Sequence, residues 1–385
     1  MHNNNPRLHA LDNLRGLMMW LGILFHVSLL HISYTQSPLV WIDPQTTLAA
    51  DLLVGFIHCF RMPVFFILAG FFAAMLLNKQ GLAGMLRNRV HRIALPFGVF
   101  WLVLFPLTIA SVLLHLHKAY DGQWGMDLKL LPNSGQPVYI DAIHMWFLWM
   151  LMWFYVFTAC VAALAQRFKN LQRISEAHMV RWLVLHPLAP LLLAIALALT
   201  QADAPMGVLE TNTSFTPPWV QWFHYSLFYL WGIGLFIHRH AALDTLARRC
   251  KSTMLASLLV FSLFLGLGNA HNQMPDRIAH ATVWLAALYS LSSWLMCMAW
   301  IGYFSRYMNR RSPVLSYLAQ SSYWVYLVHY PITIFIGAAY YEWTATAGLK
   351  ILTNVLVTTL VCGATYQVFV RRSFIGVFLN GKTYP

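Results

Sequence analysis

Residues 52–77 read LLVGFIHCFRMPVFFILAGFFAAMLL, an apolar run in which Arg61 is the single formal charge. As an α-helix this run is about 39 Å long, which exceeds the roughly 30 Å of hydrocarbon in a bilayer. Its length and composition therefore predict a membrane-spanning helix. Because a cation at membrane depth is costly, Arg61 also marks this helix as a carrier of function.

Similar apolar runs recur along the rest of the chain. Of its 385 residues, 59% are hydrophobic and only 10% are charged, whereas a soluble domain has about a quarter charged residues. We expect an all-α fold, a polytopic membrane helix bundle of about ten transmembrane helices that forms one domain over residues 1–385. The predicted spans are residues 14–34, 52–77, 94–116, 144–165, 184–200, 219–237, 253–271, 281–303, 322–341 and 349–370.

The distribution of Lys and Arg predicts the orientation of this bundle. With ten spans, twenty of the 25 Lys and Arg residues fall on one side and Arg61 falls within a span. The other side has four, Lys118, Lys129, Arg277 and Lys350. The positive-inside rule then places both termini in the cytoplasm. The formal charge of +13 is explained by the cytoplasmic leaflet of the bilayer, so we expect no nucleic-acid partner.

The first two spans place ionisable side chains at one depth. Arg15 and His26 are eleven residues apart, which puts them within about 20° of one helix face and about 16 Å apart along the axis. Arg61 lies about 14 Å below the outer surface, close to the expected depth of His26. His58 shares a helix face with Arg61. The sequence therefore predicts a mid-membrane layer with a titratable imidazole and a permanent cation.

Two later segments bring further polar groups to the membrane. His144 and Trp146 open the fourth span from the outer side, where a lone histidine also has an ordinary structural explanation. Tyr326 and His329 lie along one face of the ninth span. Pro331 follows them and is expected to kink that helix and free backbone carbonyls toward an interior cavity.

A basic rim precedes the third span in the sequence RVHRIALP, residues 89–96. Arg89 and Arg92, together with Arg15, suit phosphate groups that arrive from the cytoplasm. The same residues also have an alternative explanation as ordinary positive-inside residues. No Cys-x-x-Cys pair is present, so we expect no metal site.

Four motifs together resemble the acyltransferase family 3 membrane enzymes over nearly the whole chain. They are LDNLRG at residues 11–16 followed by His26, RMPVFFILAGF at residues 61–71, Arg92-Ile93-x-x-Pro96, and YLVHYP at residues 326–331. The chain departs from the family at Ala69, where a serine is usual. Within the family, residues 25–29, 56–62 and 144–148 resemble most the succinyltransferases of osmoregulated periplasmic glucans.

The resemblance implies an O-acyltransferase of a bacterial inner membrane. It would move a succinyl or acetyl group from cytoplasmic acyl-CoA, a co-substrate, to a hydroxyl of an extracytoplasmic glycan, with periplasmic glucan as the nearest acceptor, and without a tightly bound cofactor. Whether His26 acts only as a base or carries the acyl group covalently stays open. The assignments are catalytic for His26, Arg61 and His329; donor-binding for Arg15, Arg89 and Arg92; and substrate-binding for His58, His144, Trp146 and Tyr326.

Two other classes of protein compete with an enzyme. A proton-coupled membrane carrier also uses His and Arg at membrane depth. The basic rim and the lack of an internal repeat favour the enzyme. A structural membrane scaffold leaves the mid-membrane cation without an explanation.

Overall fold

We analysed a computed structural model that describes residues 6–33, 42–131, 140–167, 178–216, 218–274, 278–310 and 312–384. Within these ranges every regular element is a helix. The first half comprises α1 (Pro6–Leu29), α2 (Leu48–Arg89), the π-helical turn η1 (Val90–Ala94), α3 (Leu95–Asp121), the short 3₁₀ turns η2 (Leu128–Leu130) and η3 (Ile143–Met145), and α4 (Trp146–Arg167).

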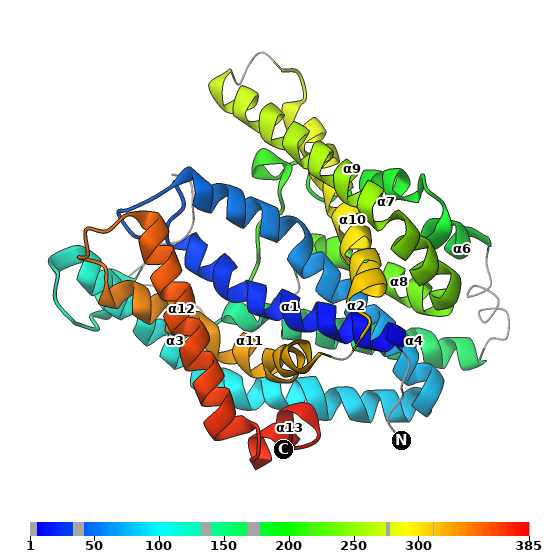
Figure 1. The fold of residues 1–385 in the computed structure, drawn as a ribbon, viewed down its shortest axis with the longest axis horizontal. Coiled ribbons are helices and arrows are strands. Elements are labelled where there is room, and N and C mark those ends of the chain that lie inside the picture. The colour runs from blue at the N-terminus through cyan, green and yellow to red at the C-terminus, as the bar shows by residue number, and fades with distance from the viewer. Residues whose placement is uncertain are drawn as a thin grey trace.

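The second half continues with helices only. They are α6 (His178–Leu185), α7 (Ala189–Ala198), the 3₁₀ turn η5 (Pro205–Gly207), α8 (Trp219–Ile237), α9 (Arg239–Gln273), α10 (Ala281–Tyr307), α11 (Pro313–Ala339), α12 (Ala347–Thr365), the π-helical turn η7 (Tyr366–Val370) and α13 (Phe374–Asn380). In Figure 1, α9 and α10 form a hairpin that projects from the body, whereas α1 lies near the centre of the view.

The helices are long and apolar enough for a membrane protein, as predicted. By length and composition, five helical segments of the described chain qualify as spans, or six if the bent pair α6 and α7 counts as one. One of the five is a 74-residue run, Leu48–Asp121, which contains two of the predicted spans joined by η1. In the part of the chain that the structure describes, α1 and α11 do not reach this threshold. Both carry polar side chains of the site described below.

The predicted span over residues 184–200 is not one continuous helix. The structure has α6 and α7 there, bent by 95° with respect to each other. Pro187 disfavours the helical conformation at His186, and Pro190 lies at the start of α7, where a missing N–H costs nothing. With only 10 residues, α7 alone is about 15 Å long, half of the hydrocarbon thickness.

Close backbone contacts through glycine hold the central helices together. A Cβ at Gly70 of α2 would lie 2.0 Å from the Tyr229 carbonyl oxygen of α8, and a Cβ at Gly232 of α8 would lie 2.0 Å from the Ile67 oxygen. At Gly16 of α1 a Cβ would lie 2.8 Å from the Ala319 Cα of α11. Small residues let membrane helices approach in this way. They set α1 against α11 and α2 against α8.

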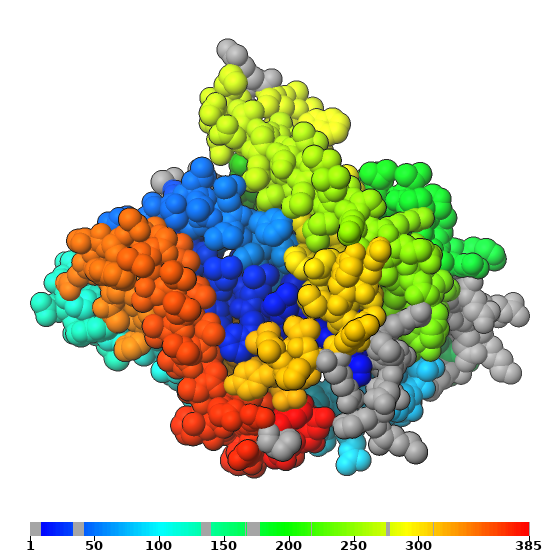
Figure 2. All heavy atoms as spheres, in the orientation of Figure 1, coloured from blue at the N-terminus to red at the C-terminus, as the bar shows by residue number. Residues whose placement is uncertain are grey.

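Figure 2 shows α1 at the centre of one face of the molecule, surrounded by α2, α10, α11 and α12. On this face, α1, the helix that carries Arg15 and His26, is therefore surrounded by other helices of the chain. This arrangement positions the candidate site between elements from both ends of the chain.

Candidate active site

Three histidines and one arginine from four separate segments meet inside the bundle. The ring centroids of His26 (α1) and His329 (α11) are 5.1 Å apart, and those of His144 (η3) and His329 are 5.9 Å apart. Arg61 of α2 is 7% exposed and its Cζ lies 4.8 Å from the centre of the Phe25 ring, next to His26 in the chain. The structure thus brings together the three residues predicted as catalytic.

His329 has a defined tautomer. Its Nδ1 lies 2.7 Å from the Val325 oxygen and 2.9 Å from the Tyr326 oxygen. A carbonyl only accepts, so Nδ1 must carry the proton and Nε2 must be the unprotonated nitrogen of the neutral ring. Among the described residues, this buried Nε2 has no hydrogen-bond partner. His329 therefore presents a free lone pair inside the bundle.

His144 is held by the carbonyl that Pro331 frees. In a regular helix the N–H of residue 331 would donate to the oxygen of Leu327, and proline has no N–H. The His144 Nε2 occupies this position, 2.9 Å from the Leu327 oxygen, and must be the donor there. The prediction that Pro331 frees a carbonyl toward the interior is consistent with this contact. The buried Nδ1 of His144 has no partner in the described parts of the chain.

The turn before His144 is strained. Ile143 has a φ of 45°, which is unfavourable for a β-branched residue and costs about 1–3 kcal/mol. Asp141 stabilises it, since its Oδ1 accepts from the Ile143 N–H at 2.8 Å and its Oδ2 accepts from the Thr213 hydroxyl at 2.6 Å. Trp101 Nε1 donates to the Asp141 oxygen at 2.8 Å. The strain is thus stored where the chain orients His144.

Arg61 is a buried cation without an acid. No carboxylate of the described residues forms an ion pair with it, and its Nε and Nη1 have no hydrogen-bond partner there. Its Nη2 lies 3.8 Å from the Met62 sulfur, a weak acceptor. A buried guanidinium in this state is costly. The site is therefore suited to an anionic group, either of a ligand or of a transition state.

Two residues of this site were missed by sequence reasoning. A Cβ at Gly22 would lie 3.5 Å from both Arg61 Nη1 and His329 Nε2, so these two nitrogens face the same point on α1. The Tyr330 ring lies 4.8 Å from His26 and 4.9 Å from His144. The available signals were the i, i+4 spacing of Gly22 and His26, and the position of Tyr330 directly after His329.

His58 lies beyond Phe25 from this group. Its ring stacks on Phe25 at 6.1 Å, and its Nδ1 lies 2.7 Å from the Tyr289 hydroxyl of α10. Phe25 therefore contacts both His58 and Arg61. A substrate contact of His58 stays a prediction.

Tyr326 contacts the histidine group, whereas Trp146 packs against aromatic side chains of α2 and α8. The Tyr326 hydroxyl donates to the His144 oxygen at 3.0 Å, so it fixes the backbone at His144. Trp146 packs against Tyr225 at 5.5 Å and against Phe66 at 6.3 Å. Their contact with substrate stays a prediction.

Of the predicted donor-binding arginines, Arg15 lies in the N-terminal half of α1, Arg89 is the last residue of α2, and Arg92 lies in η1. Arg15 pairs with Asp12 at 3.4 Å, and the Arg89 guanidinium lies over the Tyr155 ring at 4.8 Å. Arg92 Nη1 donates to the Val377 oxygen at 3.1 Å, at the C-terminal end of α13. Burial raises the pKa of the Tyr384 phenol, an effect that Arg15 and Arg92 both oppose. Arg15 and Arg92 thus both favour a lower pKa of the same phenol, that of Tyr384. Arg92 also uses one of its hydrogen-bond donors to hold α13.

The arrangement supports acyl transfer chemistry. It combines neutral imidazoles that can accept a proton with a cation that can stabilise an oxyanion, in a site shielded from water. No group of three or more His, Cys, Asp or Glu in the described ranges is arranged to hold a metal ion. The histidines are instead adjacent to a guanidinium.

Residues 8–369 match the family described as "Acyltransferase domain", acyltransferase family 3. The chain belongs to acyltransferase family 3. It is thus an O-acyltransferase with membrane helices, and the family resemblance of its motifs is confirmed.

Full-length relatives of this acyltransferase occur in bacteria. The chain is 26% identical to "Glucans biosynthesis protein C" of Escherichia coli O139:H28 (strain E24377A / ETEC), over 98% of this chain and 95% of that protein. The proteins of the same name from Shigella dysenteriae serotype 1 (strain Sd197) and Escherichia coli (strain K12 / DH10B) are also 26% identical, with the same coverage. No solved structure matches the chain.

Proposed function

We propose that this family 3 acyltransferase moves a succinyl or acetyl group from cytoplasmic acyl-CoA to a hydroxyl of an extracytoplasmic glycan. It would do so in the inner membrane, as one domain with ten spans and both termini in the cytoplasm. The name of the relatives, "Glucans biosynthesis protein C", suggests a glucan as the acceptor. The observation that carries the proposal is the buried group of His26, Arg61, His144 and His329, with its unpartnered nitrogens.

The reaction balances with these residues. The hydroxyl oxygen of the acceptor attacks the thioester carbonyl carbon while His26 takes the hydroxyl proton. Arg61 stabilises the negative oxygen of the tetrahedral intermediate. The intermediate then collapses, the carbon–sulfur bond breaks, and the thiolate of CoA receives the proton from His26. An ester and free CoA leave, and the enzyme returns to its starting state.

His329 supports this step from the opposite side of the site. Its Nε2 faces the point on α1 that Arg61 Nη1 also faces, and its lone pair is held in place by the two carbonyls at Nδ1. A hydroxyl that donates to this nitrogen would be oriented between the two histidines. His329 is therefore the second proton acceptor of the site.

The donor would enter at the basic rim. Arg15 and Arg89 would contact the phosphates of CoA, and Arg92 would contribute through the donors that α13 leaves available. Arg15 and His26 lie about 16 Å apart along the axis of α1. The extended pantetheine arm of CoA would span this distance and bring the thioester to His26.

The test is release of CoA by purified protein given acyl-CoA and a gluco-oligosaccharide, with the acylated product measured by mass spectrometry. We expect His26→Gln to lower transfer by about 10²–10⁴-fold, because glutamine hydrogen-bonds but takes up no proton at neutral pH. His115→Gln is the control, since His115 is equally a buried histidine but belongs to α3 outside the site.

Two outcomes would contradict these assignments. If neither succinyl-CoA nor acetyl-CoA releases CoA in the presence of a glycan, acyl-CoA is not the donor. If His26→Gln retains near-normal transfer while His329→Gln loses it, the base is His329.

A further inference from the structure

Gly22 is a buried glycine of α1 whose presence is not explained by close helix packing. At Gly70 and Gly232, a Cβ would overlap a carbonyl oxygen of a neighbouring helix. Outside the backbone of α1 and the two adjacent residues, the described atoms nearest to a Cβ at Gly22 are Arg61 Nη1 and His329 Nε2, both at 3.5 Å, and Arg61 Cζ at 3.6 Å. These are ordinary van der Waals distances, so an alanine would fit there without a clash.

The glycine leaves room for one more atom at this point. Gly22 lies in the interior of α1, where glycine is less favourable than alanine because it loses more backbone freedom when the helix forms. A side chain at this position would stabilise the helix but would fill the space that Arg61 and His329 both face. We therefore examined which chemical group fits that space.

The two nitrogens require a group that both accepts and donates a hydrogen bond. Arg61 Nη1 can only donate. His329 Nε2 can only accept, because Nδ1 carries the proton of the neutral ring. Both nitrogens are buried and have no partner among the described residues. A hydroxyl satisfies both of them, whereas a carbonyl or carboxylate oxygen only accepts and would leave His329 Nε2 unpaired.

This hydroxyl is different from the one that is acylated. A hydroxyl has a single proton, and in the proposed reaction the attacking hydroxyl gives its proton to His26. The His26 and His329 rings lie 5.1 Å apart, and Gly22 and His26 share one face of α1 because they are four residues apart. A sugar carries several hydroxyls close together, so one can reach each imidazole. The Nε of Arg61, also without a partner in the described ranges, remains for the oxyanion.

We propose that Gly22, Arg61 and His329 bind a second hydroxyl of the acceptor, next to the hydroxyl that is acylated; this rests on the proposed function. The second hydroxyl accepts from Arg61 Nη1 and donates to His329 Nε2, and so directs the attacking oxygen at the thioester. The enzyme thereby selects acceptors with several hydroxyls, because an acceptor that lacks the second one leaves buried polar groups unpaired.

The test combines one substitution in the protein with one change in the acceptor. Transfer from acyl-CoA is measured for methyl β-glucoside and for its monodeoxy derivatives, each of which lacks one hydroxyl. With the wild-type protein, the derivative without the second hydroxyl should have a kcat/KM about 10–100-fold lower than the parent glucoside. Gly22→Ala should lower kcat/KM for the parent by a similar factor and cause no further loss with that derivative, because both changes remove the same contact.

Thermal stability separates this role from a packing role. Gly22→Ala should keep or raise the unfolding temperature, since alanine fits without a clash and favours the helix. Gly98→Ala is the matched control, because Gly98 is also within a helix, the exposed face of α3, and a Cβ there would have no described atom within 4 Å. This variant should leave all transfer rates unchanged.

Binding gives a readout that needs no catalysis. Saturation-transfer difference NMR on the solubilised full-length protein, without acyl-CoA, compares the parent glucoside with the derivative that lacks the second hydroxyl. The wild-type protein should bind the parent about 10–100-fold more tightly. Gly22→Ala should bind the two equally.

Two results would overturn the second-hydroxyl site. One is an equal loss for Gly22→Ala with the parent and with every derivative, and the other is a lower unfolding temperature of Gly22→Ala, which would assign the glycine to packing. If the protein never uses acyl-CoA but binds glucosides with the expected dependence on Gly22, the proposed function fails and the site stands. If transfer occurs without this dependence, the proposed function stands and the site fails.

Discussion

At the scale of single residues, Arg61 is the group whose environment most restricts the substrate. It is buried, and no carboxylate in the described ranges pairs with it. A guanidinium presents a planar fork of donors to a carboxylate, whereas an ammonium is a compact point charge. The contribution of the guanidinium to activity therefore depends on whether the acyl group carries a carboxylate.

We predict that Arg61→Lys loses at least tenfold more kcat/KM with succinyl-CoA than with acetyl-CoA. The free carboxylate of a succinyl group needs neutralisation in a low-dielectric site, and acetyl has none. The measurement is initial rates of CoA release with both donors at one acceptor concentration. Equal losses would assign Arg61 to the oxyanion alone, and unchanged rates would remove it from the site.

The sequence predicted which ionisable residues meet, but not how their rings are oriented. Counting helical rise from the span ends placed His26 and Arg61 at one depth, and the structure has Arg61 over the ring that precedes His26. The tautomer of His329 depends on a side-chain rotation that folds Nδ1 back onto its own helix. Spacing does not encode that rotation, so the free Nε2 could not be predicted.

At the scale of elements, the break that Pro331 makes in the hydrogen-bond ladder of α11 determines where His144 is held. His144 Nε2 donates a hydrogen bond to the carbonyl oxygen of Leu327. This oxygen is available because Pro331 has no N–H. The helix thus carries both a catalytic candidate, His329, and the anchor of a second histidine.

We predict that Pro331→Ala lowers acyl transfer about tenfold without lowering thermal stability. The new N–H would compete with His144 for the Leu327 oxygen and restore a helical hydrogen bond. The measurement is transfer rate together with the unfolding temperature of the purified protein. Pro106→Ala is the control, since Pro106 is also inside a helix, α3, but exposed and away from the site. An unchanged rate for Pro331→Ala would mean that this contact does not orient His144.

Contacts between distant elements were beyond sequence reasoning. Lys350 was assigned to the outer side, at the start of the last predicted span. It lies in α12, is 0% exposed, and donates to both Asp43 carboxylate oxygens at 2.9 and 2.8 Å. The two residues are 307 positions apart, and no local pattern links them. Removing one partner of such a buried pair typically costs about 3–5 kcal/mol. This pair anchors Asp43, whose N–H donates to the Leu30 oxygen at 2.7 Å directly after α1, the helix that carries His26.

At the scale of the whole molecule, the apolar runs correctly predicted a bundle of helices. The number of predicted spans is larger than the number of helices that qualify by length and composition. Five or six segments of the described chain qualify by length and composition, against ten predicted spans. The long run Leu48–Asp121 merges two of them, and the bend between α6 and α7 divides another. The helices α1 and α11 contain the polar residues of the site, which lower the mean hydropathy of these helices. For this reason they do not qualify as spans by composition.

The ten-span orientation makes a prediction for the molecule as a whole. Tags at Gly122 and Ser214 should report outside, and tags at Asn170, Arg249 and Arg310 should report inside, because twenty basic residues fall on one side and four on the other. Asn170 lies outside the described residues.

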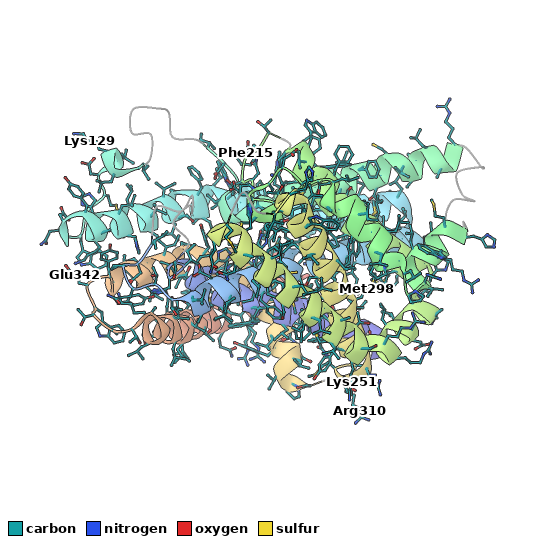
Figure 3. All side chains as sticks on the ribbon, turned by 90° about the horizontal axis from the view of Figure 1, so that it is seen from above. Lys129, Phe215, Lys251, Met298, Arg310 and Glu342 are labelled. Carbon is teal, nitrogen blue, oxygen red and sulfur yellow. The ribbon has the colours of Figure 1, made fainter. Side chains whose placement is uncertain are left out.

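In Figure 3, Lys251 and Arg310 lie along one edge of the molecule and Phe215 lies along the opposite edge, which is the separation that this orientation requires. Reporter fusions read by periplasmic and cytoplasmic activity check each position, and opposite signs at any two of them would require a different number of spans. Opposite signs at all of the tagged positions would place the basic rim of Arg15 and Arg89 away from cytoplasmic acyl-CoA, so the same fusions test the proposed direction of acyl transfer.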